Sequence, residues 1–133
     1  MTWFDADPER LQAEAELMTD GTNATLIETN GQLAWVEDLV SMGGQPYRLL
    51  VLYPDRFPYE PPKAFVLDPD IEGAPHRLLD GSLCLFDDPM HADGPKTTAL
   101  VVRNRSVVWF LAYEAWCATG AWVAPQHGGA DPL

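Results

Sequence analysis

The sequence predicts an α+β fold built from one domain, residues 1–133, with an irregular tail from about residue 121. Helical patterns stand near both ends of the chain, and four strand-like runs separated by turn residues lie between them. The length of 133 residues and the hydrophobic content of 47% suit a single sizeable core. We therefore expect an N-terminal helix, a four-stranded antiparallel meander, a long loop and a C-terminal helix.

The first helix is predicted to begin at Pro8. Asp7 can cap it, proline suits the first helical position, and Glu9 places a negative charge in the first turn. Gly21 is expected to end the helix. The apolar positions of one face are Leu11, Ala15 and Met18. The acidic positions expected to be solvated on the other face are Glu9, Glu14 and Glu16.

Three strands are predicted to follow as an antiparallel meander. Thr25–Thr29 is rich in β-branched residues, and Asn30-Gly31 separates it from a second run, Gln32–Met42. Asn-Gly between two such runs is a strong hairpin signal, because both turn residues must accept a positive φ. Gly43-Gly44 makes the second break, and Tyr47–Tyr53 is nearly all apolar. Such a run is typical of a central strand that is covered on both faces.

A proline cluster and a long loop separate the third strand from the last helix. The prolines are Pro54, Pro58, Pro61 and Pro62. Adjacent prolines cannot lie in a central strand, because neither donates a hydrogen bond to its neighbours. Lys63–Leu67 is the predicted fourth strand, and residues 68–95 form an irregular stretch rich in Asp, Gly, Pro and His. Loops of that length in a compact domain are usually functional.

The last helix is predicted over Val107–Thr119, with Ser106 as its N-cap and Gly120 at its C-terminal end. It is apolar on two faces, one of which is the aromatic series Trp109, Tyr113 and Trp116. A helix of this kind is either deeply buried or half of an interface, and the sequence leaves both alternatives open.

Composition and charge exclude several classes of protein. The formal net charge of −12 disfavours binding to nucleic-acid backbones and to anionic membranes, since both need clustered Lys and Arg. No targeting segment is visible, and no apolar stretch is long enough to span a bilayer. The two cysteines, Cys84 and Cys117, do not make a disulfide framework. We expect a cytoplasmic protein with reduced thiols and with no nucleic-acid or membrane partner.

The sequence contains no recognisable metal or cofactor motif. The histidines His76, His91 and His127 have no partners at metal-ligand spacing, and the two cysteines do not form Cys-x-x-Cys. Glycine-rich phosphate loops and Gly-x-Ser-x-Gly elbows are also absent. We expect neither a metal ion nor a cofactor.

Cys84 is the strongest candidate for chemistry. Its neighbours Leu83 and Leu85 fit a small buried residue, and composition alone favours that interpretation. Its place in a loop rich in Asp, Gly and Pro favours instead an accessible thiol. Cys117 is expected to pack in the core, because it lies in an apolar helix beside Trp116.

His76 lies eight residues before Cys84 and is open to three interpretations. It can be a general base, an oxyanion donor or a hydrogen-bonded structural residue. The first interpretation would suit a cysteine hydrolase, which needs a base within hydrogen-bond reach of the thiol.

Two segments together resemble the ubiquitin-conjugating enzymes. They are Tyr53-Pro54-Asp55-Arg56-Phe57-Pro58-Tyr59-Glu60-Pro61-Pro62-Lys63 and His76-Arg77-Leu78-Leu79-Asp80-Gly81-Ser82-Leu83-Cys84-Leu85. Their order matches that family: an aromatic-Pro turn, a Pro-Pro pair, a strand, then a Gly and a Cys followed by Leu. The resemblance implies the family's fold, with an active-site loop that holds Cys84 as the catalytic residue. It places His76 where those enzymes carry an Asn that stabilises the oxyanion, and an imidazole can also donate that hydrogen bond.

A narrower resemblance is to the bacterial conjugating-enzyme-like proteins of antiphage cyclic-oligonucleotide defence operons (CBASS). It rests on His76 and the Asp80–Leu85 segment, together with downstream positions: Trp109, Tyr113, Glu114, Trp116, Thr119, Gly120, Trp122 and His127. In that group the enzyme modifies the C-terminus of a cyclic-nucleotide synthase and joins it to a target. The resemblance implies a synthase or ubiquitin-like protein as cargo, and a role in antiviral defence.

These features together predict an acyltransferase. Cys84 would accept a protein C-terminus from an activating enzyme as a thioester and pass it to an amine, usually a lysine of an acceptor protein. Asp87 and Asp88 are candidates for orienting the incoming ammonium, and ordinary solvated carboxylates are the other interpretation. The alternative function is a conjugating-enzyme-like binding module that recognises a partner without chemistry.

Overall fold

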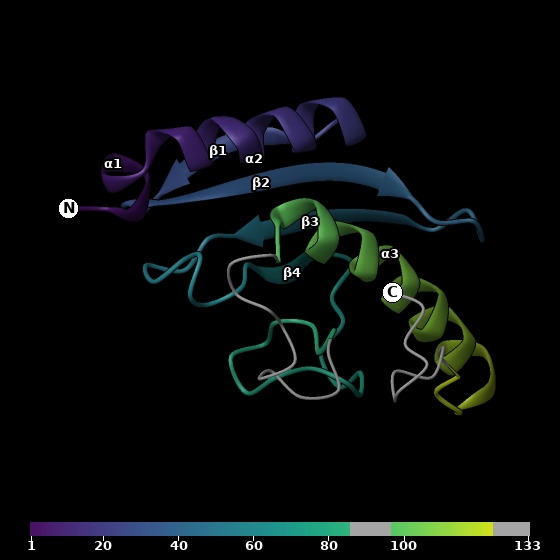
Figure 1. The fold of residues 1–133 in the computed structure, drawn as a ribbon. Coiled ribbons are helices and arrows are strands. Elements are labelled where there is room, and N and C mark those ends of the chain that lie inside the picture. Colours follow the sequence, from purple (N-terminus) through teal and green to yellow (C-terminus); the bar gives the residue numbers. More distant parts are fainter. Residues whose placement is uncertain (86–96, 124–133) are drawn as a thin grey trace, which may run out of the picture.

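The structure is a computed structural model, which describes residues 1–85 and 97–123. Its elements are α1 (Trp3–Ala6), α2 (Pro8–Gly21), β1 (Thr25–Thr29), β2 (Gln32–Val40), β3 (Pro46–Leu52), β4 (Lys63–Asp68) and α3 (Ala99–Thr119), as Figure 1 shows. The strands form one antiparallel sheet in the order β1-β2-β3-β4. The predicted α+β class and the four-stranded meander are confirmed.

The two turns of the meander explain where its strands end. Asn30 and Gly31 have φ angles of 52° and 77°, so the predicted Asn-Gly hairpin is confirmed. β2 ends at Val40, earlier than the predicted Met42, because a turn begins at Ser41. Ser41 donates to the Gln45 carbonyl at 2.9 Å and accepts from the Gly44 N–H at 2.9 Å.

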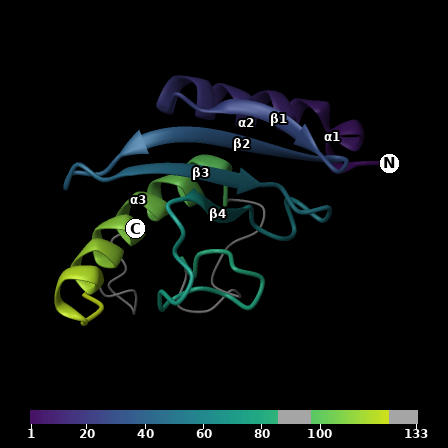
Figure 2. The same ribbon diagram turned by 180° about the vertical axis from the view of Figure 1, so that it is seen from behind.

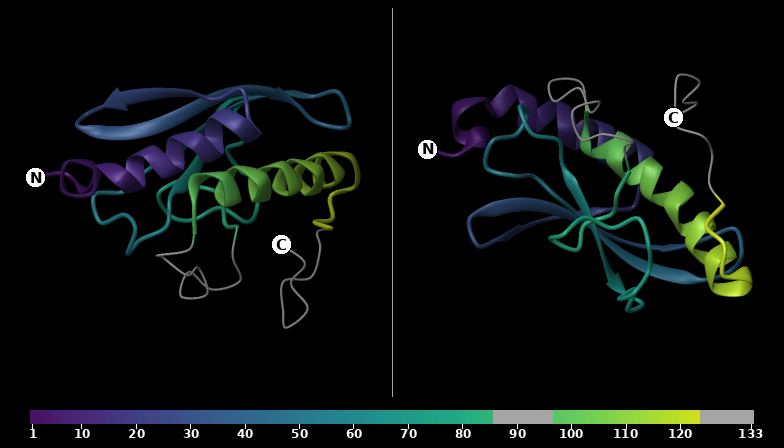
Figure 3. Two further views of the ribbon diagram at one scale, coloured as in Figure 1. Left: turned by 45° about the horizontal axis from the view of Figure 1, so that its top comes forward. Right: turned by 90° about the horizontal axis from the view of Figure 1, so that it is seen from below.

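Helices α2 and α3 lie side by side on one face of the sheet (Figure 3), and Figure 2 looks onto the opposite face. The β3 residues that face the helices are Tyr47, Leu49 and Val51, each at most 2% exposed. The expectation that both faces of this strand are covered is wrong, because no described helix lies over the second face. Leu50 and Leu52 are half-buried there, since their cross-strand neighbours shield them, and they complete the apolar run.

The N-terminal end holds a short helix that the sequence did not predict. Thr2 caps α1 by accepting from the Asp5 N–H at 3.1 Å, and Trp3 is buried against Tyr53 and Phe57. A four-residue helix carries no periodic pattern, which is why it escapes sequence reasoning. The start of α2 is confirmed, because the Asp7 carboxylate accepts from the Arg10 N–H at 3.1 Å.

Glu14 corrects the expected orientation of α2. Its side chain is only 3% exposed, although Glu9 and Glu16 are exposed as predicted. The carboxylate accepts from the Tyr53 hydroxyl at 2.8 Å and from the Ala99 N–H at 2.9 Å. Burial raises the pKa of Glu14, and these two hydrogen bonds oppose that shift only in part. A buried acid with satisfied partners therefore links α2, the end of β3 and the first residue of α3.

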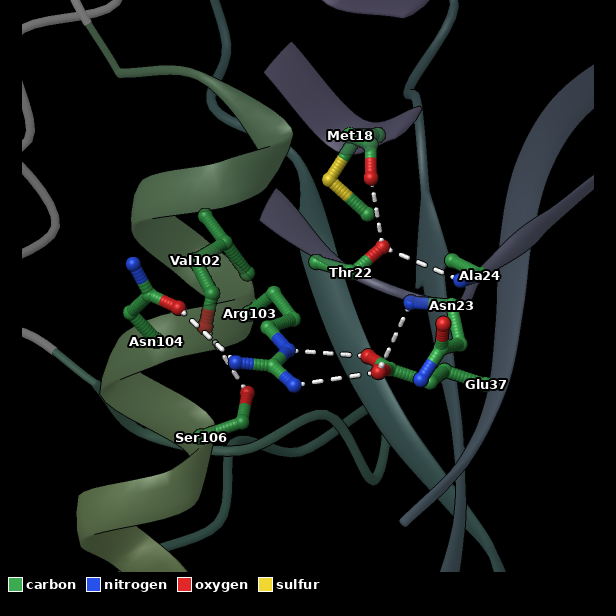
Figure 4. Close-up of polar contacts among 9 residues, drawn as sticks. All are labelled: Met18, Thr22, Asn23, Ala24, Glu37, Val102, Arg103, Asn104 and Ser106. Carbon is green, nitrogen blue, oxygen red and sulfur yellow. Dashed lines mark hydrogen bonds and ion pairs between the residues drawn. The ribbon is translucent and has the colours of Figure 1, made fainter. Parts of the chain in front are cut away.

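Helix α3 begins two turns before the predicted start. Thr98 is the N-cap and accepts from the Val101 N–H at 3.2 Å. Ser106, the predicted cap, is fully buried inside the helix and donates its hydroxyl to the Val102 carbonyl at 2.8 Å (Figure 4). A serine can either cap a helix or bond back to its preceding turn, and the sequence alone does not separate these uses. No described helix is both long and apolar enough to cross a membrane.

A partly buried ion pair fixes α3 to the sheet. Arg103 donates from Nε and Nη2 to the two carboxylate oxygens of Glu37 on β2, at 2.8 and 3.0 Å (Figure 4). The Asn23 N–H donates to the same carboxylate at 3.3 Å. Glu37 is 5% exposed, and the two-pronged geometry sets the rotation of α3 about its axis.

Replacement of Glu14 by Ala should lower the free energy of unfolding by about 2–5 kcal/mol, because the Tyr53 hydroxyl and the Ala99 N–H lose their acceptor. Urea unfolding at pH 7 measures this change. Glu16→Ala is the matched control, since Glu16 is exposed on the same helix and accepts only from Gln12 in the described part of the chain. An equal effect of the two substitutions would contradict the structural role of Glu14.

Candidate active site

Cys84 lies in an extended segment that is anchored to β4. The Leu83 N–H donates to the Ala64 carbonyl at 2.9 Å. Because side chains alternate along an extended chain, Leu83 and Leu85 enter the core at 4% and 7% exposure while Cys84 turns the other way. Cys84 is half-buried and forms no disulfide. Its leucine neighbours are therefore the core residues, and the thiol reaches the surface between them.

A tight hairpin precedes the cysteine. Arg77 and Leu83 form an antiparallel bridge, and the Leu78 N–H donates to the Ser82 carbonyl at 2.8 Å. The Gly81 N–H donates to the Leu78 carbonyl at 2.9 Å, and Gly81 has a φ of 90°, which side chains rarely allow. Part of the stretch predicted to be irregular is thus regular, with a turn that the sequence analysis did not predict at Asp80-Gly81.

Asp80 locks this hairpin to β4. Its carboxylate accepts from the Ser82 N–H at 2.9 Å, from the Ser82 hydroxyl at 2.6 Å and from the Lys63 ammonium at 2.7 Å. Burial acts to raise the pKa of Asp80, but the hydrogen bonds from Lys63 and Ser82 outweigh it and lower the pKa to about 2. Sequence reasoning did not single out Lys63 and Asp80, although Asp-Gly-Ser is a known signal for a side chain that bonds its own turn.

His76 contacts Cys84 through a backbone hydrogen bond. Its carbonyl accepts from the Cys84 N–H at 2.9 Å and from the Trp109 indole N–H at 3.0 Å. The residue has a φ of 57°, a left-handed conformation that is uncommon outside glycine and in which Asn, Asp and His are enriched. The imidazole stacks on Trp122 with ring centroids 4.9 Å apart and an interplanar angle of 28°. The structure therefore brings together the two residues that the sequence selected.

A mainly apolar groove of about 270 Å³ opens beside Cys84. Its apolar lining residues are Pro61, Pro62, Ala64, Leu78, Leu83 and Leu85, and Glu60, Lys63, Ser82 and Cys84 complete it. The Pro-Pro pair and the cysteine segment, far apart in the sequence, therefore line the same groove.

Helix α3 supports the site from behind. Arg105 donates from Nη1 to the Leu85 carbonyl at 3.1 Å, and Trp109 is 4% exposed. Tyr113 and Trp116 are partly buried against the same core. Of the two alternatives left open by the sequence, Trp109 is therefore a core residue, and its indole also contacts the site. Cys117, in contrast, is exposed, so its predicted core packing is wrong. An apolar neighbour in the sequence does not decide which side of a helix a residue faces.

Four residues considered from the sequence lie outside the described part of the chain. They are Asp87, Asp88, His91 and His127. Among the residues that the structure does describe, no group of three or more His, Cys, Asp and Glu side chains is placed to hold a metal ion.

Comparison with known protein families identifies a family for this chain. Residues 13–129 match the family described as type II CBASS E2 protein, which covers most of the chain and includes α3 and the whole candidate site. A search of curated proteins finds no match.

From the left-handed backbone conformation of His76 we predict the relative stability of two substitutions at this position. His76→Gly should be about 1 kcal/mol more stable than His76→Ala, because only glycine adopts a positive φ without strain. Urea unfolding of the two variants measures the difference. The order should reverse at Glu16, inside α2, where alanine favours the helix by about 1 kcal/mol over glycine. The same order at both positions would contradict the strained conformation.

Proposed function

Because this chain belongs to the type II CBASS E2 family, we propose that it carries a protein C-terminus as a thioester on Cys84 and passes it to an amine. Family membership indicates a conjugating-enzyme-like role in antiphage defence. The thioester on Cys84 is the further step. It is supported chiefly by the position of the thiol, half-buried in the wall of a groove and held between two core leucines.

The proposed reaction has two steps. First, the Cys84 thiol gives its proton to solvent, the sulfur attacks the activated carbonyl carbon of the cargo's C-terminus, a C–S bond forms and the activating group leaves. Then an amine nitrogen attacks the same carbon, a C–N bond forms, the C–S bond breaks and the amine proton goes to solvent. The product is an amide, and the Cys84 sulfur takes a proton from solvent to regenerate the thiol.

The groove beside Cys84 suits the tail of the cargo. A chain that is joined to the sulfur through its last carbonyl must continue along the surface next to the thiol, where the apolar groove lies. The contact between Asp80 and Lys63 holds this side of the groove in place, and the Lys63 ammonium balances the negative charge of the Asp80 carboxylate. The proposed cargo is a ubiquitin-like protein or a cyclic-nucleotide synthase. The proposed partners are an activating enzyme and an acceptor with a lysine.

His76 is the proposed oxyanion donor. In both steps the carbonyl oxygen takes up negative charge, and an imidazole N–H nearby can stabilise it. The support is the hydrogen bond between the His76 carbonyl and the Cys84 N–H, which brings the two residues side by side. Asp87 and Asp88 follow the site in the chain, and we propose that they orient the incoming ammonium.

Cys84 should form a covalent adduct when the protein is expressed together with the other products of its operon. We expect a heavier band on a non-reducing gel, removed by a thiol reductant and by Cys84→Ala. The matched control is Cys117→Ala, since Cys117 is exposed but lies on α3 outside the groove. An adduct that requires Cys117 would contradict the proposal. No adduct in any sample, with an activating enzyme present, would favour the binding module.

His76→Ala should slow transfer to the amine about 10²–10³-fold, which is the usual cost of removing one oxyanion donor. Formation of the thioester should change much less, because the acyl group arrives activated and the cysteine sulfur is a stronger nucleophile than an amine, so this step depends less on stabilisation of the oxyanion. Time courses of loading and of lysine-dependent discharge, followed on the same preparation, separate the two rates. An equal loss in both steps would remove the oxyanion assignment.

A further inference from the structure

We propose that Trp122 is a positioning residue for this reaction, acting by holding the imidazole of His76 in one orientation. The inference rests on the proposed function, since it takes His76 as the oxyanion donor. It is carried by the stack between the two rings, with centroids 4.9 Å apart, and by the contacts that hold Trp122 itself.

The backbone of His76 is already held without Trp122. Its carbonyl accepts from the Cys84 N–H and from the Trp109 indole, so the main chain is tied to the cysteine and to α3. Neither hydrogen bond restrains the ring, which rotates about its own side-chain bonds and is largely exposed. The described ring contact of His76 is the one with Trp122.

Trp122 reaches His76 because α3 ends in a reversal. Gly120 has a φ of 78°, and its N–H donates to the Trp116 carbonyl at 2.8 Å, which closes the helix. The Ala121 N–H then donates to the Thr119 hydroxyl at 3.1 Å. These bonds turn the chain back, so that Trp122 packs on Trp109 with centroids 5.2 Å apart.

The stack on Trp122 restricts the directions in which the His76 imidazole can donate a hydrogen bond. An aromatic face covered by another ring is closed to polar partners, while the N–H groups of an imidazole lie in the plane at its edge. Near-parallel rings, at 28°, therefore restrict the imidazole to edgewise donation in one plane. Because oxyanion donors act through preorganised geometry, a free ring would stabilise the transition state less.

The test loads the thiol with a small thioester probe in place of the natural cargo. Full-length protein carrying Cys117→Ala is incubated with the benzyl thioester of N-acetylglycine, which passes its acyl group to Cys84 and releases benzyl thiol. After removal of the probe, L-lysine is added and the loss of the acyl adduct is followed by intact-protein mass spectrometry. In this background, Trp122→Leu, Trp122→Phe, His76→Ala and the double variant His76→Ala/Trp122→Leu are compared.

Trp122→Leu should slow discharge ~10–100-fold, the effect expected of a misplaced catalytic group, and Trp122→Phe should restore most of the rate because it keeps an aromatic face. The double variant should be no slower than His76→Ala, since Trp122 acts only through the imidazole. The inference would be overturned if the discharge rate of the double variant fell by the product of the two single-variant effects. An unchanged discharge rate in Trp122→Leu would also overturn it. Trp116→Leu controls for lost packing, because Trp116 is also a partly buried aromatic residue and its described ring contact is with Tyr113.

Failure of the proposed function gives a different result. If His76→Ala discharges at the wild-type rate, the oxyanion role fails, and a slow Trp122→Leu then reports packing alone, which also overturns the inference. If His76→Ala is slow and Trp122→Leu is not, only the inference fails. Thermal unfolding of every variant identifies losses that follow from unfolding.

Discussion

The rest of this structure depends on one buried carboxylate. Glu14 joins α2 to the hydroxyl of Tyr53, and Tyr53 in turn accepts from the Trp35 indole at 2.9 Å. The same carboxylate accepts from the Ala99 N–H, where the positive end of the α3 dipole favours a negative charge. The acid thus bonds directly to Tyr53, which follows β3, and to the first residue of α3, and it is linked to β2 through Tyr53. Its burial is unfavourable, and only a full set of hydrogen bonds makes it tolerable.

Fixing the first residue of α3 also fixes what its later turns can reach. Residues 105 and 109 are four apart and share one face of the helix, so a start set at Ala99 aims both at the cysteine loop. Arg105 then contacts the Leu85 carbonyl, and Trp109 contacts the His76 carbonyl. The ion pair between Arg103 and Glu37 sets the rotation about the helix axis. The candidate site is consequently placed by contacts far from it in the sequence.

Patterns of adjacent residues predicted the helices, strands and turns. Contacts between residues far apart in the sequence decided which side chains are buried. The Asn30-Gly31 hairpin and the Asp7 cap could be predicted because each is specified by adjacent residues with one favourable conformation. Glu14, Ser106 and Cys117 could not, because each has two plausible environments and only its neighbours across the fold choose between them. The His76–Cys84 pair was predictable by resemblance, whereas the stack of His76 on Trp122 joins segments with no shared local pattern.

The contacts that hold the cysteine segment also explain why residue 76 can differ from the Asn of the eukaryotic enzymes. Leu83 bonds to the Ala64 carbonyl, Cys84 to the His76 carbonyl and Arg105 to the Leu85 carbonyl. Each of these bonds ends on a backbone oxygen, which any residue supplies. The path of the chain around Cys84 therefore needs no hydrogen bond from the side chain at position 76, and Asn and His are both among the residues that adopt the positive φ found there. An amide or an imidazole can occupy it without disturbing the thiol, provided that something else orients the ring, and the described neighbour that stacks on it is Trp122.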